Sequence, residues 1–156
     1  MVKKDYLCSP LSPKRKKIME KYESKQQQIL RPVSQIYPLI SDFSLLTPAV
    51  ADKVEEWHAT ADTCSFKVKG FTVRLKMVEK VENKHVKIQS DEEGGGLPVD
   101  FSFWIQLHEV SATDTRMRLV LHAELNMMMR MMIGGKIQKG LDQAAEGIAK
   151  AFNARP

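Results

Sequence analysis

The segment TCSFKVKGFTVRLKM, residues 63–77, predicts the architecture of this chain most clearly. A two-residue turn at Lys69-Gly70 would set Val68 opposite Phe71, and directly opposed residues of a hairpin point to the same face of a sheet. Every second residue on either side of this turn is apolar, and the residues between are polar. The apolar set is Cys64, Phe66, Val68, Phe71, Val73, Leu75 and Met77. The segment therefore predicts a hairpin with one buried and one solvated face.

The same alternation continues on both sides of this hairpin and predicts an antiparallel meander. The period-two segments are residues 54–60, 63–69, 71–81, 85–91, 98–110 and 115–125. The turn signals between them are Ala61-Asp62, Lys69-Gly70, Asn83-Lys84, Gly94 to Gly96 and Ser111 to Thr113. The apolar residues of successive strands stay on one face of the sheet if Trp57 opposes Phe66 and Val81 opposes Val86. In the last pair Phe103 would oppose Leu121, which requires an odd-length loop such as residues 111–113.

Helical patterns flank the meander. Pro32 suits the first turn of a short helix, and Ser44 is a candidate cap for a second one that ends near Pro48. Asn126 is a good N-cap for a long helix that runs to about Asn153. Its apolar stripe is Ile133, Ile137, Leu141, Ala144, Ala145, Ile148 and Phe152. Before the short helices, residues 20–30 predict a first, edge-like strand, with Tyr22, Ser24, Gln26, Gln28 and Leu30 on one face. The fold class is therefore α+β, a seven-stranded curved sheet around a long C-terminal helix.

The positive charge lies almost entirely at the N-terminus. The 156-residue chain has a formal charge of +5, and residues 1–17 contain six basic residues and one acidic residue, which also gives +5. The remaining 18 basic and 18 acidic residues cancel. We predict a disordered basic tail at residues 1–18 and one domain at residues 19–156. Specific nucleic-acid binding by the domain is not expected. Whether translation starts at Met1 or Met19 stays open.

No stretch approaches the roughly 20 apolar residues of a membrane-spanning helix, and no apolar block of a secretory signal is present. We therefore expect a cytoplasmic protein. Cys8 lies in the tail and Cys64 in a strand, so a disulfide between them is not expected and Cys64 is predicted to be buried. Trp104 is predicted on the outer face near Val120, as an exposed aromatic or a dimer patch, so the chain is a monomer or a weak homodimer.

Motifs for common catalytic chemistries are absent from the sequence. It contains no HExxH, CxxC, GxSxG, P-loop or GxGxxG pattern. Parity points His58, His108 and His122 away from the apolar face, and His85 borders a turn. The sequence predicts no catalytic residue, no metal site and no cofactor.

The order of strand, two short helices, six-stranded meander and long C-terminal helix resembles the START-like helix-grip superfamily, also called SRPBCC or polyketide cyclase-like. The resemblance covers residues 19–152. Besides the element order, three sequence segments support it: DTCSFKV (62–68), FSFWIQLHEV (101–110) and TRMRLVLHAELNMMMRMM (115–132). The chain is most similar to the small bacterial stand-alone members. The resemblance implies a cavity between sheet and helix that holds lipid-like, sterol-like or polycyclic molecules.

On this basis we expect the protein to bind or carry a small hydrophobic molecule. The predicted lining is Trp57, Phe66, Val73, Leu75, Phe101, Phe103, Ile105, Leu119, Leu121, Met128, Met131, Ile137 and Leu141. The methionines at residues 127–132 would suit a cavity mouth, because thioether side chains adapt to varied apolar shapes, or would fill core space. Two other hypotheses remain: a cyclase or dehydratase acting in the same cavity, and a protein-interaction module without a ligand. A polar pair with shifted pKa values deep in the cavity would favour the first of these.

Overall fold

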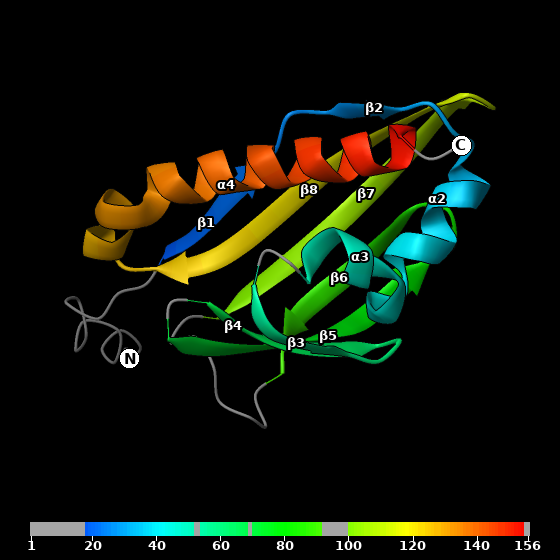
Figure 1. Cartoon of the computed structure of the whole chain (residues 1–156). Coiled ribbons are helices and arrows are strands. Elements are labelled where there is room, and N and C mark those ends of the chain that lie inside the picture. Colours follow the sequence, from blue (N-terminus) through cyan, green and yellow to red (C-terminus); the bar gives the residue numbers. More distant parts are fainter. Residues whose placement is uncertain (1–17, 52–53, 69, 92–99, 155–156) are drawn as a thin grey trace, which may run out of the picture.

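The computed structural model of the chain describes residues 18–51, 54–68, 70–91 and 100–154. One antiparallel sheet curves around a long C-terminal helix, α4, and short helices lie near one end of it (Figure 1). The elements are β1 (Ile18–Glu23), β2 (Gln27–Ile29), α2 (Val33–Ile40), η3 (Phe43–Leu46), α3 (Thr47–Val50), β3 (Glu55–Ala59), β4 (Thr63–Val68), β5 (Phe71–Val81), β6 (His85–Ser90), β7 (Phe101–Ser111), β8 (Asp114–Leu125) and α4 (Met127–Asn153). This arrangement confirms the predicted fold class.

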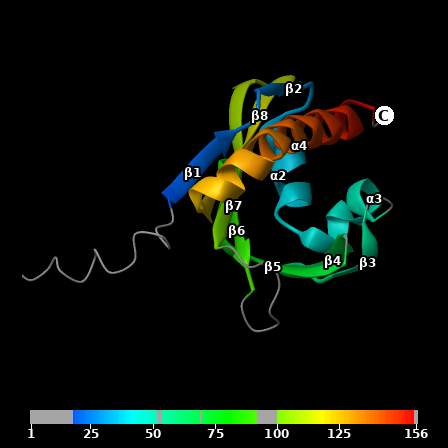
Figure 2. The same ribbon diagram turned by 90° about the vertical axis from the view of Figure 1, so that its left-hand side faces the viewer.

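The sheet has the strand order β1-β8-β7-β6-β5-β4-β3, and β2 also pairs with β8. Figure 2 shows the strands curving around α4 and α2, which lie on the concave side. The predicted tail, residues 1–18, lies outside the described residues except for Ile18, which begins β1. The Gly94 to Gly96 connection also lies outside them.

The hairpin of β4 and β5 has the predicted register. Val68 pairs with Phe71, Phe66 with Val73 and Cys64 with Leu75. Gly70, at φ 85°, supplies the left-handed conformation that the tight turn requires. The alternation of apolar and polar residues was therefore sufficient to place these two strands.

The register of β7 and β8 is also the predicted one, but its connection is different. Phe103 pairs with Leu121 and Ile105 with Leu119. Ser111 pairs with Asp114, so the turn contains two residues rather than the predicted three. A β-bulge between Glu109 and Ser111 takes up the extra residue. The predicted residue pairs are therefore correct, and a bulge in β7, rather than a loop with an odd number of residues, makes them possible.

The predicted pairing of Val81 with Val86 was wrong for a similar reason. Val81 pairs with His85 instead, and the extra residue is absorbed at Val78, between Met77 and Glu79. The three-residue turn contains Asn83 at φ 63°, a left-handed conformation that asparagine tolerates.

The predicted first strand is interrupted, which changes the face of its second half. Tyr22 pairs with Leu121 and Gln27 with Met117, so the four residues between Tyr22 and Gln27 lie opposite three on β8. At the break the backbone amide of Ser24 donates to the Leu119 carbonyl at 2.8 Å, and the Leu119 amide donates to Ser24 Oγ at 2.9 Å. Beyond it Ile29 is fully buried, whereas Gln28 and Leu30 are exposed.

The helices follow the predicted positions with one change of cap. Pro32 precedes α2 directly, and Asn126 caps α4, its Oδ1 accepting a hydrogen bond from the Met129 amide at 2.8 Å. The second short helix is capped by Asp42, not by Ser44, because the Asp42 carboxylate accepts from the Ser44 amide at 2.9 Å. It consists of a 3-10 turn, η3, followed by the single turn α3.

Candidate functional site

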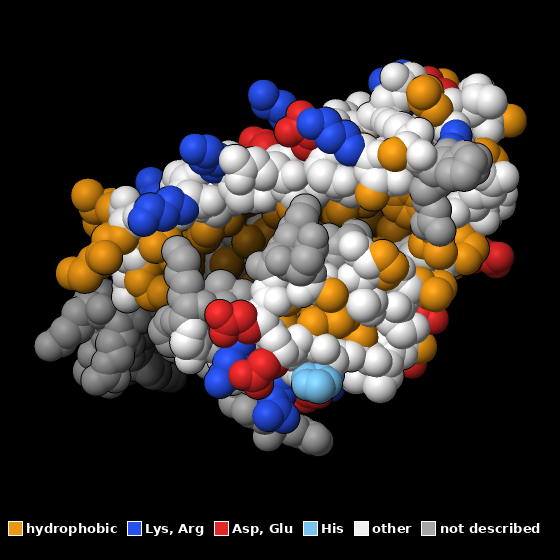
Figure 3. Space-filling model, viewed as in Figure 1, with side chains coloured by type: hydrophobic (Ala, Val, Ile, Leu, Met, Phe, Trp, Pro, Cys, Tyr) orange, Lys and Arg blue, Asp and Glu red, His pale blue; other side chains and the backbone are white. Residues whose placement is uncertain are grey.

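The concave side of the sheet is hollowed beneath α4. Figure 3 shows this hollow between α4 and the β3–β4 hairpin, with hydrophobic side chains at its bottom. Register and burial identify side chains that face it. Phe66, Leu75, Phe103 and Leu121 have the parity of the core face and pack against the core, yet each remains partly exposed. A side chain that faces inward and keeps contact with solvent lines an accessible space.

The interior is closed at one end and open at the other. Ile105 and Leu119 on β7 and β8 are 3% and 0% exposed, whereas Phe103 and Leu121, the next pair along the same strands, are only partly buried. The helix has the same gradient: Leu141, Ala145, Ala149 and Phe152 are buried, and Ile133 and Ile137 are partly exposed. The open end therefore lies under the N-terminal half of α4, and the closed end lies beside α2.

The predicted lining residues fall into three groups. The first belongs to the closed core: Val73, Ile105, Leu119 and Leu141. The second is partly buried: Trp57, Phe66, Leu75, Phe101, Phe103, Leu121 and Ile137. The third is exposed: Met128 and Met131. The structure brings the second group to the open part of the concave face.

The indole of Trp57 is fixed on this face by contacts with two elements. Its ring lies 5.9 Å from the ring of Phe66, and its Nε1 donates to Thr47 Oγ1 in α3 at 2.8 Å. Trp57 and Phe66 are not direct ladder partners, because the register shifts between Glu55 and His58 and Glu56 has φ 54°. The sequence predicted their proximity but not this bulge.

Hydrogen bonds from α4 to the edge of the sheet hold the helix over the hollow. Gln138 Nε2 donates to the Glu23 carbonyl at 2.8 Å, and the Lys25 amide donates to Asp142 at 2.8 Å. Near the C-terminus, Asn153 accepts from the Leu30 amide at 2.7 Å. Because these side chains bind main-chain groups, the separation of helix and edge strand is defined along most of α4.

Tyr22 enters the same interface from β1. A Cβ placed on Gly134 would lie 3.2 Å from Tyr22 Oη, so the absence of a side chain at Gly134 makes room for the tyrosine hydroxyl. Gly135 has no atom within 4 Å of such a position. The Tyr22 hydroxyl therefore occupies space that a side chain at position 134 would need.

Polar groups on the concave side are few. Cys64 is 5% exposed, as predicted, and burial raises the pKa of its thiol to about 12, so the thiol stays protonated and is a poor nucleophile. Ser90 pairs with Leu75 and is partly buried. Glu20, on the same face of β1 as Tyr22, forms an ion pair with Arg130 of α4 at 3.5 Å.

The four histidines lie away from the hollow. His58 and His108 are exposed, His85 Nε2 lies 2.6 Å from a Glu79 oxygen, and His122 stacks beside Trp104 on the convex face, with ring centroids 4.6 Å apart. Trp104 pairs with Val120, as the predicted register requires. Within residues 18–51, 54–68, 70–91 and 100–154, no three His, Cys, Asp or Glu side chains form a metal-binding group.

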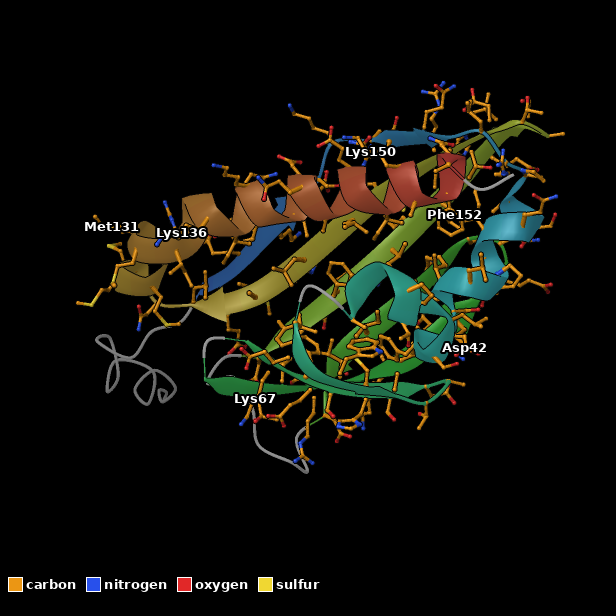
Figure 4. All side chains as sticks on the ribbon, in the orientation of Figure 1. Asp42, Lys67, Met131, Lys136, Lys150 and Phe152 are labelled. Carbon is orange, nitrogen blue, oxygen red and sulfur yellow. The ribbon has the colours of Figure 1, made fainter. Side chains whose placement is uncertain are left out.

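Sequence reasoning missed an apolar groove at the closed end. Its volume is about 390 Å³. It is lined by Leu39, Ser44, Leu45, Leu46, Pro48, Ile148, Ala151 and Phe152. In Figure 4 Phe152 lies under the C-terminal end of α4, on the side of the short helices. The apolar residues around Leu45 were the only indication of this groove in the sequence. Their contact with α4 could not be predicted without the tertiary structure.

No described helix combines the length and the apolar character needed to cross a membrane. Comparison with known proteins finds no matching family model and no matching curated sequence. Among solved structures, norcoclaurine synthase from Thalictrum flavum has a TM-score of 0.71 at 13% identity, covering 89% of each chain. Its complex with dopamine and hydroxybenzaldehyde has a TM-score of 0.71 at 12% identity, covering 100% of this chain and 97% of that one.

A protein from Thermus thermophilus has a TM-score of 0.66 at 18% identity, covering 86% of this chain and 98% of its own. An uncharacterised protein from Bacillus thuringiensis has a TM-score of 0.65 at 10% identity, covering 85% and 98%. At these identities the likeness concerns the fold alone. It agrees with the element order: the chain has the helix-grip α+β fold that norcoclaurine synthase also has.

Proposed function

We propose that the protein binds a small hydrophobic molecule, lipid-like or polycyclic, in the hollow between the sheet and α4, as a non-enzymatic binder or carrier of the START-like superfamily. The observation that carries this proposal is the step in burial between Leu119 and Leu121. The proposal attributes the difference between these two leucines, which share one strand and one face, to an open space beside Leu121. Trp57, Phe66 and Phe103 add aromatic surface to that space, which suits a flat or ring-containing ligand.

The remaining predicted residues complete the proposed site. Phe101, Leu75 and Ile137 extend the lining, Val73, Ile105, Leu119 and Leu141 form its closed floor, and Met128 and Met131 stand at its mouth. Tyr22 and Ser90 supply the polar atoms that would orient a bound molecule. Burial of apolar surface supplies the affinity, at roughly 25 cal/mol per Å² before the losses of ordering are subtracted.

An enzyme of the cyclase or dehydratase type is the weaker proposal. Its support is that norcoclaurine synthase, an enzyme by name, shares the fold. Among the described residues with a shifted pKa, only Cys64 lies on the core face, and its protonated thiol suits neither proton transfer nor nucleophilic attack. Binding without chemistry therefore accounts better for this interior.

The decisive experiment is native mass spectrometry of protein purified without delipidation, followed by extraction of any bound molecule. We expect a stoichiometric apolar adduct that is lost in a Phe103→Trp variant, because the larger indole fills the hollow. Val110→Trp introduces the same indole at the exposed end of β7, outside the hollow, and should keep the adduct. A protein that carries no adduct and leaves an apolar fluorescent probe dark would contradict the proposal.

A further inference from the structure

The first two turns of α4 expose an unusual amount of apolar surface. Met127, Met128, Met131 and Met132 are 64%, 69%, 78% and 67% exposed. We call these four residues the methionine patch. Figure 3 shows hydrophobic side chains gathered at this end of α4, and in Figure 4 Met131 lies at the end of the helix and points away from the sheet. Single exposed apolar residues are normal, but four within six positions require an explanation.

The charges on α4 beside the patch are positive, and one of them, Arg130, is ion-paired with Glu20 of β1. Arg130, Lys136 and Lys139 fall within residues 127–141, which contain no acidic residue, so this stretch carries +3. The tail, residues 1–17, carries +5. Because the whole chain is +5, the remaining residues sum to 5 − 5 − 3, or −3. The positive charge is therefore concentrated in the tail and the first half of α4.

Strand pairing places Ile18, the residue that follows the tail in the sequence, next to the start of α4. Ile18 begins β1 and pairs with Leu125, and Leu125 directly precedes Asn126, the N-cap of α4. The basic tail is therefore attached to the domain next to the methionine patch. Exposed apolar side chains flanked by lysine and arginine are the combination that binds the surface of an anionic bilayer.

We propose that the methionine patch docks the protein onto an anionic lipid membrane. The methionines enter the boundary between headgroups and acyl chains, and Lys136 and Lys139 reach lipid phosphates. At 1.5 Å rise per residue, these lysines lie about 8 and 12 Å along the helix from Met131, close enough for lysines and methionines to contact one bilayer surface together.

A second copy of the chain suits this surface less well. A twofold dimer would bring the same patch from each copy together, and with it +3 against +3. Protein interface cores are depleted of lysine, whereas membrane-binding helices are rich in it. The charges therefore favour lipid over self-association.

This proposal goes beyond ligand binding and does not depend on it. The test is flotation of the full chain with vesicles of phosphatidylcholine alone, and with phosphatidylglycerol added, at low and high salt. We expect binding to the anionic vesicles that weakens with salt. Met128→Gln with Met131→Gln should reduce it about tenfold, because the apolar contact is lost. Lys136→Gln with Lys139→Gln should also reduce it about tenfold.

Matched controls separate the patch from general effects. Leu30→Gln with Val110→Gln removes two apolar residues that are 51% and 56% exposed elsewhere, and should leave vesicle binding unchanged. Lys76→Gln with Lys84→Gln removes the same charge from exposed positions on β5 and in its turn, with the same expectation. Phe103→Trp should also bind vesicles normally. Loss of the ligand, seen as loss of the adduct, can therefore be distinguished from loss of membrane docking, seen by flotation.

Three outcomes would overturn the proposal. One is a wild-type protein that stays with the buffer at low salt. Another is a double methionine variant that floats as well as the wild type, which would assign binding to the tail alone. The third is a dimer, seen by light scattering, that the double methionine variant converts to a monomer while vesicle binding persists, which would make the patch an interface between two copies.

Discussion

The backbone amide of Lys25 donates a 2.8 Å hydrogen bond to a carboxylate oxygen of Asp142, which joins the break between β1 and β2 to α4. The other carboxylate oxygen accepts from Gln138 Nε2 at 3.3 Å. These two hydrogen bonds hold the pKa of Asp142 below the ordinary value for aspartate, and the one from the Lys25 amide has the larger effect. A charged acceptor therefore helps to keep the helix above the hollow.

Asp142→Asn should change the acid stability of the protein. A carboxyl whose pKa is lower in the folded state stabilises it above the unfolded pKa, about 3.9, and this contribution is lost as the pH falls through the folded pKa. The variant should therefore be less stable than wild type at neutral pH, with a difference that shrinks below about pH 4. Urea unfolding across this range measures it. Glu146→Gln, the same charge change on α4, is the control, and an equal difference at both ends of the range would contradict the prediction.

Gly134→Ala and Gly135→Ala should differ although they are neighbours in one helix. Gly135→Ala should raise the free energy of unfolding by about 1 kcal/mol, because alanine is the better helix former and its methyl group meets nothing within 4 Å. Gly134→Ala should gain less, since its methyl group would lie 3.2 Å from Tyr22 Oη. Adding Tyr22→Phe should restore the gain. Equal stability of the two alanine variants, measured by thermal unfolding, would show that Tyr22 does not limit the approach.

The sequence was most informative where one face of a strand is buried. A slip of one residue would have turned Phe103 and Ile105 toward solvent, so the pairing of β7 with β8 followed from the pattern. The bulges at Val78 and before Ser111 did not follow from it. A bulge and a longer turn both preserve the apolar face, and the sequence pattern does not distinguish them.

The sequence predicted which side chains lie on the concave face of the sheet, but not which of them are covered by the helices. Alternation places Leu119 and Leu121 on the same side, and nothing local to either residue indicates that only the first is sealed. That difference depends on how far α2 and α4 reach over the sheet. The exposure of Met131 has the same origin, because it depends on where α4 extends past the sheet.

Leu119→Ala and Leu121→Ala separate the core from the hollow. Leu119 is fully buried, so its truncation should lower the free energy of unfolding by about 2 to 5 kcal/mol. Leu121→Ala should lower it by less, since part of that side chain already faces an open space. Binding of an apolar fluorescent probe should instead change more in Leu121→Ala. Denaturant unfolding and probe titration of both variants provide the comparison, and identical losses of stability would argue against an open interior.

The thiol of Cys64 should be almost inert in the folded protein. Burial raises its pKa to about 12, so at neutral pH its thiolate fraction is about a thousandfold below that of an unperturbed cysteine. In a Cys8→Ser background, alkylation should therefore be slow until denaturant is added. The same background with Ser34→Cys supplies an exposed thiol on α2 that should react at the ordinary rate. Equal rates for the two thiols in the native protein would mean that solvent reaches Cys64 and that burial does not protect it.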